Sequence, residues 1–201
     1  MDLSPMILPS VDRKEVARVL DDVGEHVRLK TIADLGRAEL ARLFDAAADN
    51  EPLDLDHFVP REVPPMTEVI HEGKNSLGLF TRFQKRFCRP PSTFTKPELW
   101  GYNEQSMRLF TGPGYFVAHR PAEGGVVVDY TRLPPDKPQG WPPILPNSAR
   151  LSRFIYNGTV DVMRKVSAHV SVGRAFRAGK AMDAWFILAR CVGGGIPVAQ
   201  H

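Results

Sequence analysis

The chain has little cysteine, no long apolar run and no strong excess of one charge, and each absence excludes a class of protein. Its two cysteines, Cys88 and Cys191, lie far apart and outside any CxxC or Cys/His spacing. The sequence therefore predicts neither a disulfide scaffold nor a zinc site. No apolar run reaches the roughly 18 residues of a membrane span, and the N-terminus lacks the pattern of a signal peptide. We expect a soluble, cytoplasmic protein without a bound metal.

Positive charge exceeds negative charge by a small margin. The 201 residues include 26 Lys and Arg against 23 Asp and Glu, which gives a net charge of +3. Nucleic-acid binders usually carry stronger and more clustered positive charge, so this balance does not favour nucleic acid as a partner. A hydrophobic fraction of 43% and a charged fraction of 24% are typical of one globular domain.

The motifs that commonly identify a reaction are also missing. The triplets Gly112-Pro113-Gly114 and Gly193-Gly194-Gly195 are glycine-rich, but neither completes a dinucleotide-binding or P-loop pattern. The chain has no HExxH metalloprotease motif and no GxSxG nucleophile elbow. The sequence therefore assigns no cofactor and no reaction, and it leaves the ligand and the oligomeric state open.

Residues 10–50 have the pattern of a helical hairpin that follows a loose leader. Asp12 and Glu15 make an acidic start of the capping-box kind. Apolar residues then recur at helical spacing, at Val16, Val19, Leu20, Val23 and Val27. A second helix is expected from Gly36, with Glu39 three residues on and an apolar stripe of Leu40, Leu43, Phe44 and Ala47.

Residues 51–111 resemble an irregular connector with one short helix. Prolines within 50–73 oppose both a long helix and a central strand, so that stretch is either a surface connector or a wall of a site. The short helix is expected over residues 76–89, with phenylalanines on one side. A basic stripe occupies its other side, formed by Arg82, Lys85, Arg86 and Arg89. This stripe is either an anion-binding surface or an ordinary solvated helix face.

Residues 112–191 are expected to be β-rich. Aromatic and β-branched residues predict strands at 115–120 and 126–132, joined by a turn at Gly124-Gly125. Further strands are expected at 151–156 and 184–191. Over residues 160–176 the alternation of valines with polar residues favours a strand, but helical spacing of some valines leaves a helix open.

These patterns together predict an α+β fold in a single domain. N-terminal helices pack on a curved antiparallel sheet formed mainly by residues 112–191, because the helices precede the strands instead of alternating with them. The proline-rich stretch 134–146 is expected to be a loop of undetermined role. Residues 192–201 are expected to be a flexible tail.

Histidines on the expected strands are the candidates for chemistry. His169 shares a strand face with Ser167 and Ser171, so the three would form a polar floor if that face lines a cavity. A solvated sheet face is the other interpretation. His119 is within reach of Asp129 across the first hairpin, either as a catalytic pair or as a surface cross-strand pair. The catalytic candidates are therefore His169, His119 and Asp129.

The expected function is the binding of a small, largely apolar molecule between sheet and helices. The expected contacts are Tyr115, Trp141, Tyr156, Ser167, His169 and Ser171. One alternative is an enzyme that uses the same cavity with His169 or His119 as general base. A second alternative is an interaction module that binds an anionic partner through the basic helix 76–89.

Overall fold

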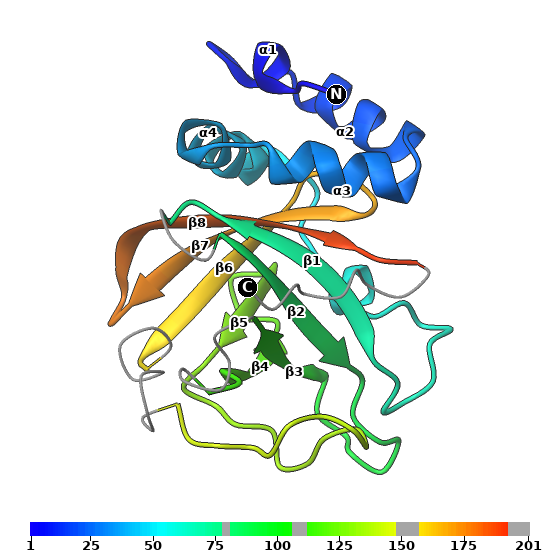
Figure 1. Cartoon of the computed structure of the whole chain (residues 1–201). Coiled ribbons are helices and arrows are strands. Elements are labelled where there is room, and N and C mark those ends of the chain that lie inside the picture. The colour runs from blue at the N-terminus through cyan, green and yellow to red at the C-terminus, as the bar shows by residue number, and fades with distance from the viewer. Residues whose placement is uncertain (78–80, 106–111, 148–156, 193–201) are drawn as a thin grey trace.

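The chain forms a closed antiparallel β-barrel with a helical layer on one side (Figure 1). The computed structural model describes residues 1–77, 81–105, 112–147 and 157–192. In these ranges the barrel strands are β1 (Val69–Asn75), β2 (Arg82–Cys88), β3 (Glu98–Glu104), β4 (Tyr115–His119), β5 (Val126–Asp129), β6 (Thr159–Lys165), β7 (Val170–Arg177) and β8 (Lys180–Arg190).

This architecture confirms the α+β class and the antiparallel sheet, and it corrects the shape and extent of the sheet. Each strand pairs with the next, and β1 closes the ring by pairing with β8, where His71 lies opposite Arg190. The sheet is therefore a barrel, not an open curved sheet. It begins at Val69, so three strands lie in the region expected to be an irregular connector.

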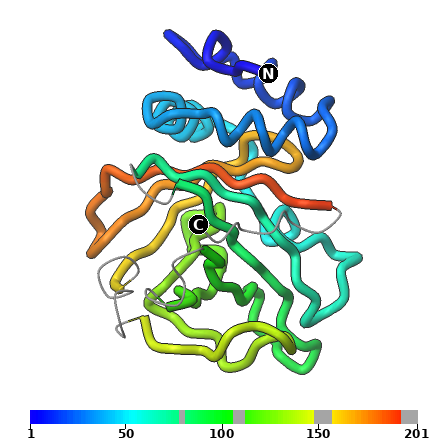
Figure 2. The backbone as a smooth tube through the Cα atoms, viewed as in Figure 1, coloured from blue at the N-terminus to red at the C-terminus, as the bar shows by residue number. Residues whose placement is uncertain are grey.

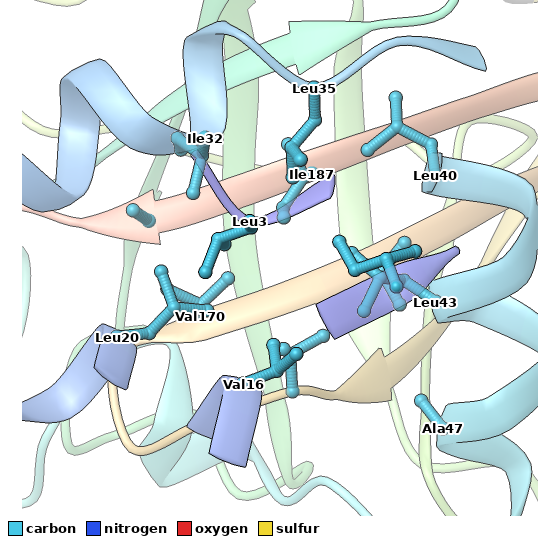
Figure 3. Close-up of a cluster of buried hydrophobic side chains, with 14 of the residues drawn as sticks. Leu3, Val16, Leu20, Ile32, Leu35, Leu40, Leu43, Ala47, Val170 and Ile187 are labelled. Carbon is cyan, nitrogen blue, oxygen red and sulfur yellow. The ribbon is translucent and has the colours of Figure 1, made fainter. Parts of the chain in front are cut away.

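Four helices form the layer above the barrel wall at β7, β8 and β1 (Figure 1). They are α1 (Ser4–Ile7), α2 (Arg13–Asp22), α3 (Glu25–Ala33) and α4 (Arg37–Ala46). Their apolar side chains, among them Leu20, Ile32 and Leu40, pack against Val170 and Ile187 on the outer wall (Figure 3). Burial of these side chains fixes the layer to the barrel.

Basic side chains from the barrel also hold the ends of two helices. The Lys74 ammonium donates to the carbonyls of Ala33 and Leu35, both at 3.0 Å, where α3 ends. The Arg164 guanidinium donates to the Phe44 carbonyl of α4 at 2.6 Å. Positive groups at helix C-termini bind otherwise unpaired carbonyls and are attracted by the negative end of the helix dipole.

The helix predictions are correct for the second helix and partly wrong for the first. α4 follows Gly36 and buries its predicted stripe. At the other helix, Asp12 accepts a hydrogen bond from the Glu15 amide at 3.1 Å, as the capping pattern predicted. That helix ends early because Gly24 separates α2 from α3, and Val27 is left 42% exposed. The expected loose leader contains α1, which buries Ile7.

The helix predicted over residues 76–89 is wrong, because residues 82–88 form strand β2. Phe83 and Phe87 lie four residues apart, a spacing that puts them on one face of a strand as well as on one side of a helix, and pairing with β1 and β3 selects the strand. Before β1, the short helices η1 (Ala47–Asp49) and η2 (Leu55–His57) lead the chain from the helical layer to one end of the barrel.

The later hairpins follow the sequence more closely. β4 and β5 are joined through Gly124 and Gly125, both at positive φ, as predicted. The open question over residues 160–176 is answered by two strands, β6 and β7, with a tight turn at 166–169 between them. The strand expected at 151–156 and nearly all of the tail expected at 192–201 lie outside the described residues.

The proline-rich stretch 134–147 covers the outer wall away from the helical layer (Figure 2). Trp141 packs there with Tyr102 and Tyr115, and its indole nitrogen donates to Glu68 at 2.6 Å. Tyr115 donates to the Pro142 carbonyl at 2.6 Å. This loop therefore buries an aromatic cluster between itself and strands β3 and β4.

Candidate functional site

The barrel interior is lined by apolar side chains around a small polar centre. Phe87, Leu99, Phe116, Val128 and Leu188 are all fully buried there. Alternate residues of each strand face inward, and the cross-strand registers bring these residues onto one continuous inner wall. Any polar group on this wall is removed from water, so its partners determine what it can do.

At three positions in the described part of the chain, the inner wall has a glycine covered by a phenylalanine. The cross-strand pairs are Gly73 with Phe83, Gly101 with Phe116, and Gly173 with Phe186. A Cβ atom at any of the three glycines would lie under 3.0 Å from the facing ring. Glycine is therefore required here for close approach of the rings, which turn their faces toward the barrel centre.

Lys85 and Asp161 form an ion pair across the barrel interior. Lys85 comes from β2 and Asp161 from β6, which stand on opposite walls of the eight-stranded ring. The Lys85 ammonium lies 3.1 Å from the Asp161 carboxylate, and the two side chains are 3% and 6% exposed. The pair therefore joins two opposite walls in an environment from which water is excluded.

Tyr130 and Asn103 complete this polar centre. The Lys85 ammonium donates to the side-chain oxygen Oδ1 of Asn103 at 3.1 Å and to the Tyr130 hydroxyl. The Asn103 amide also donates to the Tyr130 hydroxyl, at 2.9 Å, and Tyr130 hydrogen-bonds Asp161. All three hydrogens of the ammonium thus point at oxygen acceptors, which fixes its position.

Four aromatic rings surround the Lys85 nitrogen. Its distance to the ring centroid is 4.9 Å for Tyr130, 4.9 Å for Phe186, 5.2 Å for Phe116 and 5.7 Å for Phe83. The electron-rich faces of such rings attract a cation. The same phenylalanines that cover the glycines therefore also enclose the amine.

Burial shifts both members of the pair toward their neutral forms. Loss of water lowers the pKa of the Lys85 ammonium, although Asp161 beside it acts in the opposite direction. Loss of water likewise raises the pKa of the Asp161 carboxyl, against the effects of Lys85 and Tyr130. The proton between them is therefore held less tightly by the amine than it would be at the protein surface.

One end of the barrel is filled by the segment that precedes β1. Phe58 is fully buried, and its ring centroid lies 5.0 Å from that of Phe87 and 5.5 Å from that of His71. The Phe58 carbonyl accepts a hydrogen bond from His71 Nε2 at 2.9 Å. We call residues 53–59 the plug. Asn103 is near the C-terminal end of β3 and Tyr130 directly follows β5, so both lie toward the opposite end of the barrel.

Two inward-facing polar atoms have no hydrogen-bond partner among the described residues. They are Nδ1 of His71, which lies directly opposite Lys85 across β1 and β2, and Oγ of Ser171 on β7. Both residues are fully buried. Burial lowers the pKa of His71 to about 3, so its ring is neutral and Nδ1 is an acceptor when Nε2 holds the proton.

The structure does not bring the predicted catalytic histidines into the barrel. His119 faces outward, with Nε2 3.8 Å from Asp129, so the two form the cross-strand pair that the sequence allowed. His169 lies in the turn between β6 and β7, and its Nδ1 is 3.2 Å from the Arg190 guanidinium. A general-base role for either histidine stays a prediction, without the shared cavity on which it was based.

The predicted polar floor is divided between a turn and a strand. Ser167 and His169 belong to the turn, whereas Ser171 faces the barrel interior on β7. The expected common face is wrong because the chain reverses at 166–169, so these residues do not belong to one strand. Of the three, Ser171 remains a candidate for contact with a ligand inside the barrel.

The predicted aromatic contacts gather outside the barrel. Tyr115 and Trp141 meet beneath the loop 134–147, where Tyr115 is fully buried and Trp141 nearly so. Tyr156 lies outside the described residues. Their cluster faces away from the barrel interior, and a ligand contact by either residue stays a prediction.

The four residues of the predicted basic stripe point in different directions, because residues 82–88 form a strand and not a helix. Arg82 is exposed, Lys85 points into the barrel, and Arg86 on the outer face pairs with Glu68. Arg89 follows the strand and pairs with Asp56 at 3.1 Å. Anion binding by this set stays a prediction, but the four residues share no surface.

Sequence reasoning missed Asp161, Tyr130 and Asn103 as members of one site. Asp161 lies between Val160 and Val162, a pattern that places the valines in the core and the carboxylate in water. In the structure Asp161 faces the buried interior, whereas the outward-facing Val160 and Val162 are half-buried, and Val162 packs against the core beneath the helices. A period-two reading of residues 83–87 would have placed Lys85 between two phenylalanines.

The fold and this centre define a class: an up-and-down antiparallel barrel with a buried lysine–carboxylate pair and an external helical layer. No family model, no curated protein and no solved structure matches the chain. In the described ranges, no helix combines the length and apolarity needed to cross a membrane. The same ranges contain no cluster of three His, Cys, Asp or Glu side chains suited to a metal ion.

Proposed function

We propose that the barrel interior binds a small, largely apolar molecule whose polar group contacts the Lys85–Asp161 centre. Eight-stranded barrels have an interior that side chains can just fill or that can hold one small ligand. The phenylalanine-lined wall favours an apolar ligand body. The polar centre favours one hydrogen-bonding group on that ligand.

The observation that carries this proposal is the ion pair itself. Taking two charges out of water costs more than an apolar pair of similar size would cost, so a buried salt bridge is poor at stabilising a fold. Lys85 and Asp161 occupy central positions where leucine or methionine would fill the space. A role in recognition explains why charged residues occupy positions that stability alone would give to apolar ones.

Two further features support an interior site. His71 Nδ1 and Ser171 Oγ are buried without partners among the described residues, which is costly unless a ligand or water satisfies them. Phe83, Phe116 and Phe186 stand over glycines, so no wall side chain lies behind these rings. A change of their χ1 angles exposes bare backbone and makes room for a ligand.

The test uses the full chain with methyl-labelled Leu, Val and Ile and the neutral probe N-phenyl-1-naphthylamine. We expect saturable binding that shifts the methyl signals of Leu99, Val128 and Leu188, which face inward. Methyls of Leu20 and Ile187, beneath the helices, serve as the internal control and should not shift. Absence of saturable binding, or shifts confined to the control methyls, would overturn the proposal.

Native mass spectrometry of the purified protein provides an independent measurement. An interior ligand retained through purification appears as a discrete mass increase that organic extraction removes. The extracted compound should compete with the naphthylamine probe for the interior site and should itself shift the signals of the inward-facing methyls. A retained compound that leaves these methyls unchanged would contradict an interior site.

A further inference from the structure

We propose that Lys85 forms a reversible imine with an apolar aldehyde or ketone bound inside the barrel. This inference rests on the proposed function, because the carbonyl compound must occupy the interior. It goes further by naming the reactive atom and the chemical class of the ligand.

The groups around Lys85 are those that imine chemistry needs. A lysine is a nucleophile in its neutral form, and an apolar enclosure favours that form. Asp161, at 3.1 Å, can accept a proton from the ammonium, and Tyr130 is in hydrogen-bonding contact with the nitrogen. The enclosing rings of Phe116 and Phe186 favour a ligand with an aromatic or otherwise apolar body.

The first step transfers a proton and forms a carbon–nitrogen bond. Asp161 takes one proton from the Lys85 ammonium, and the neutral amine attacks the carbonyl carbon. The carbonyl π electrons move to the oxygen, which receives a second proton from the nitrogen through the Tyr130 hydroxyl. The product is a neutral carbinolamine, with the Asp161 carboxyl protonated.

The second step breaks the carbon–oxygen bond. The carbinolamine oxygen takes the proton from Asp161 and leaves as water, while the nitrogen lone pair forms the C=N bond. The nitrogen keeps its third hydrogen and carries a positive charge. The balance is ammonium plus carbonyl giving iminium plus water, so Asp161 is the counter-ion before and after the reaction.

This balance agrees with the hydrogen bonds in the unliganded centre. Three acceptors bind the three ammonium hydrogens, namely Asn103, Tyr130 and Asp161. The iminium nitrogen keeps one hydrogen, which can donate a hydrogen bond to the Asp161 carboxylate, so the ion pair is retained. Asn103 is then released to hydrogen-bond a polar group of the ligand.

The experiment traps the imine with 2-naphthaldehyde and cyanoborohydride at neutral pH, followed by peptide mass spectrometry of the full chain. We expect the reduced naphthylmethyl adduct mainly on Lys85 and its complete loss in Lys85→Met. Lys165→Met is the matched control, because Lys165 pairs with Glu51 at 2.7 Å in an exposed ion pair. That variant should be labelled at Lys85 like the unaltered protein.

Tyr130→Phe distinguishes a chemical role from packing. Loss of a positioned proton donor should slow adduct formation on the order of 10²-fold while the naphthylamine probe still binds. An unchanged rate in this variant would contradict the assigned role of Tyr130. The comparison needs no removal of either charge, so it does not depend on a variant that leaves an unpaired ion.

The outcomes separate the two proposals. Interior methyl shifts with the naphthylamine probe but no adduct on Lys85 would overturn the imine and leave the proposed function standing. Absence of both would overturn both. Adducts spread over exposed lysines such as Lys14 and Lys180, with Lys85 unlabelled, would also overturn the imine.

Discussion

The barrel wall is buried on two sides, and the two sides are built differently. Beneath the helices the outer wall presents Val170, Val172 and Ile187 to an apolar helix surface, and charged side chains there meet helix ends. The inner wall contains Lys85 and Asp161 at its centre. The outer contact therefore resembles an ordinary domain core, whereas the inner wall carries groups that packing does not require.

The largest expected effect comes from breaking the ion pair on the inner wall. Asp161→Ala should lower the free energy of unfolding by about 3–5 kcal/mol, because it leaves the buried Lys85 charge without its partner. The double variant Lys85→Met/Asp161→Leu should recover most of that loss. Chemical denaturation of Lys85→Met, Asp161→Leu and the double variant gives the coupling energy of the pair.

The outer wall supplies the control for this comparison. Leu20→Ala removes a fully buried side chain between the helices and the barrel, at a cost of about 2–5 kcal/mol. It should leave binding of the naphthylamine probe unchanged. Equal loss of probe binding in this variant and in Asp161→Ala would mean that the two walls are not functionally distinct.

A smaller effect is expected at the glycines of the inner wall. Gly173→Ala places a methyl group against the ring of Phe186, and overpacking of this kind costs about 1–3 kcal/mol. Gly101→Ala should cost more than Gly173→Ala, because its Cβ also meets the Arg86 carbonyl of the backbone, which cannot turn aside as a ring can.

Thermal and chemical unfolding of these variants provide the measurement. Phe186→Leu in the Gly173→Ala background should restore part of the lost stability by giving the methyl group space. Gly24→Ala is the control, because a Cβ there meets no atom within 4 Å. Additive effects of Gly173→Ala and Phe186→Leu would contradict the close packing of this pair.

The difference between the two walls also explains how far the sequence could predict the fold. Helix α4 and the β4–β5 hairpin were predictable, because their signals are local: a buried stripe after Gly36, and two glycines between β-branched runs. Closure of the barrel was not predictable in this way. It pairs His71 with Arg190, and nothing local in β1 marks that partner.

The polar centre was hidden for a related reason. In an open sheet, a charged residue among valines marks the solvent face, and Asp161 has that pattern. In the barrel the pattern is reversed: Asp161 is buried inside, where Lys85 pairs with it, whereas the outward-facing valines of β6 are only half-buried. The basic residues near Lys85 fit helical spacing as well as strand spacing. What decides for a strand is pairing with β1 and β3, and those partners lie outside residues 82–89.

The effect that is smallest near neutral pH, and the sharpest difference between the walls, concerns pH. Burial keeps the pKa of His71 at about 3, whereas an unfolded histidine titrates near 6.5. Above pH 6.5 both states are neutral at this residue and its stabilisation is fully present. As pH falls from 6.5 toward 3, the unfolded state binds a proton that the folded state does not, so stability falls by about 1.4 kcal/mol per pH unit.

This proton can be assigned by substitution. His71→Gln keeps a donor for the Phe58 carbonyl but does not titrate, so the slope of unfolding free energy against pH between 6.5 and 4.5 should decrease by about 1.4 kcal/mol per unit. Phe87→Leu alters the same contact on the inner wall and should keep the original slope. Leu20→Ala on the outer wall should also keep it. A slope unchanged by His71→Gln would mean that His71 is protonated in the folded barrel, and the inner wall would then tolerate an added charge beside Lys85.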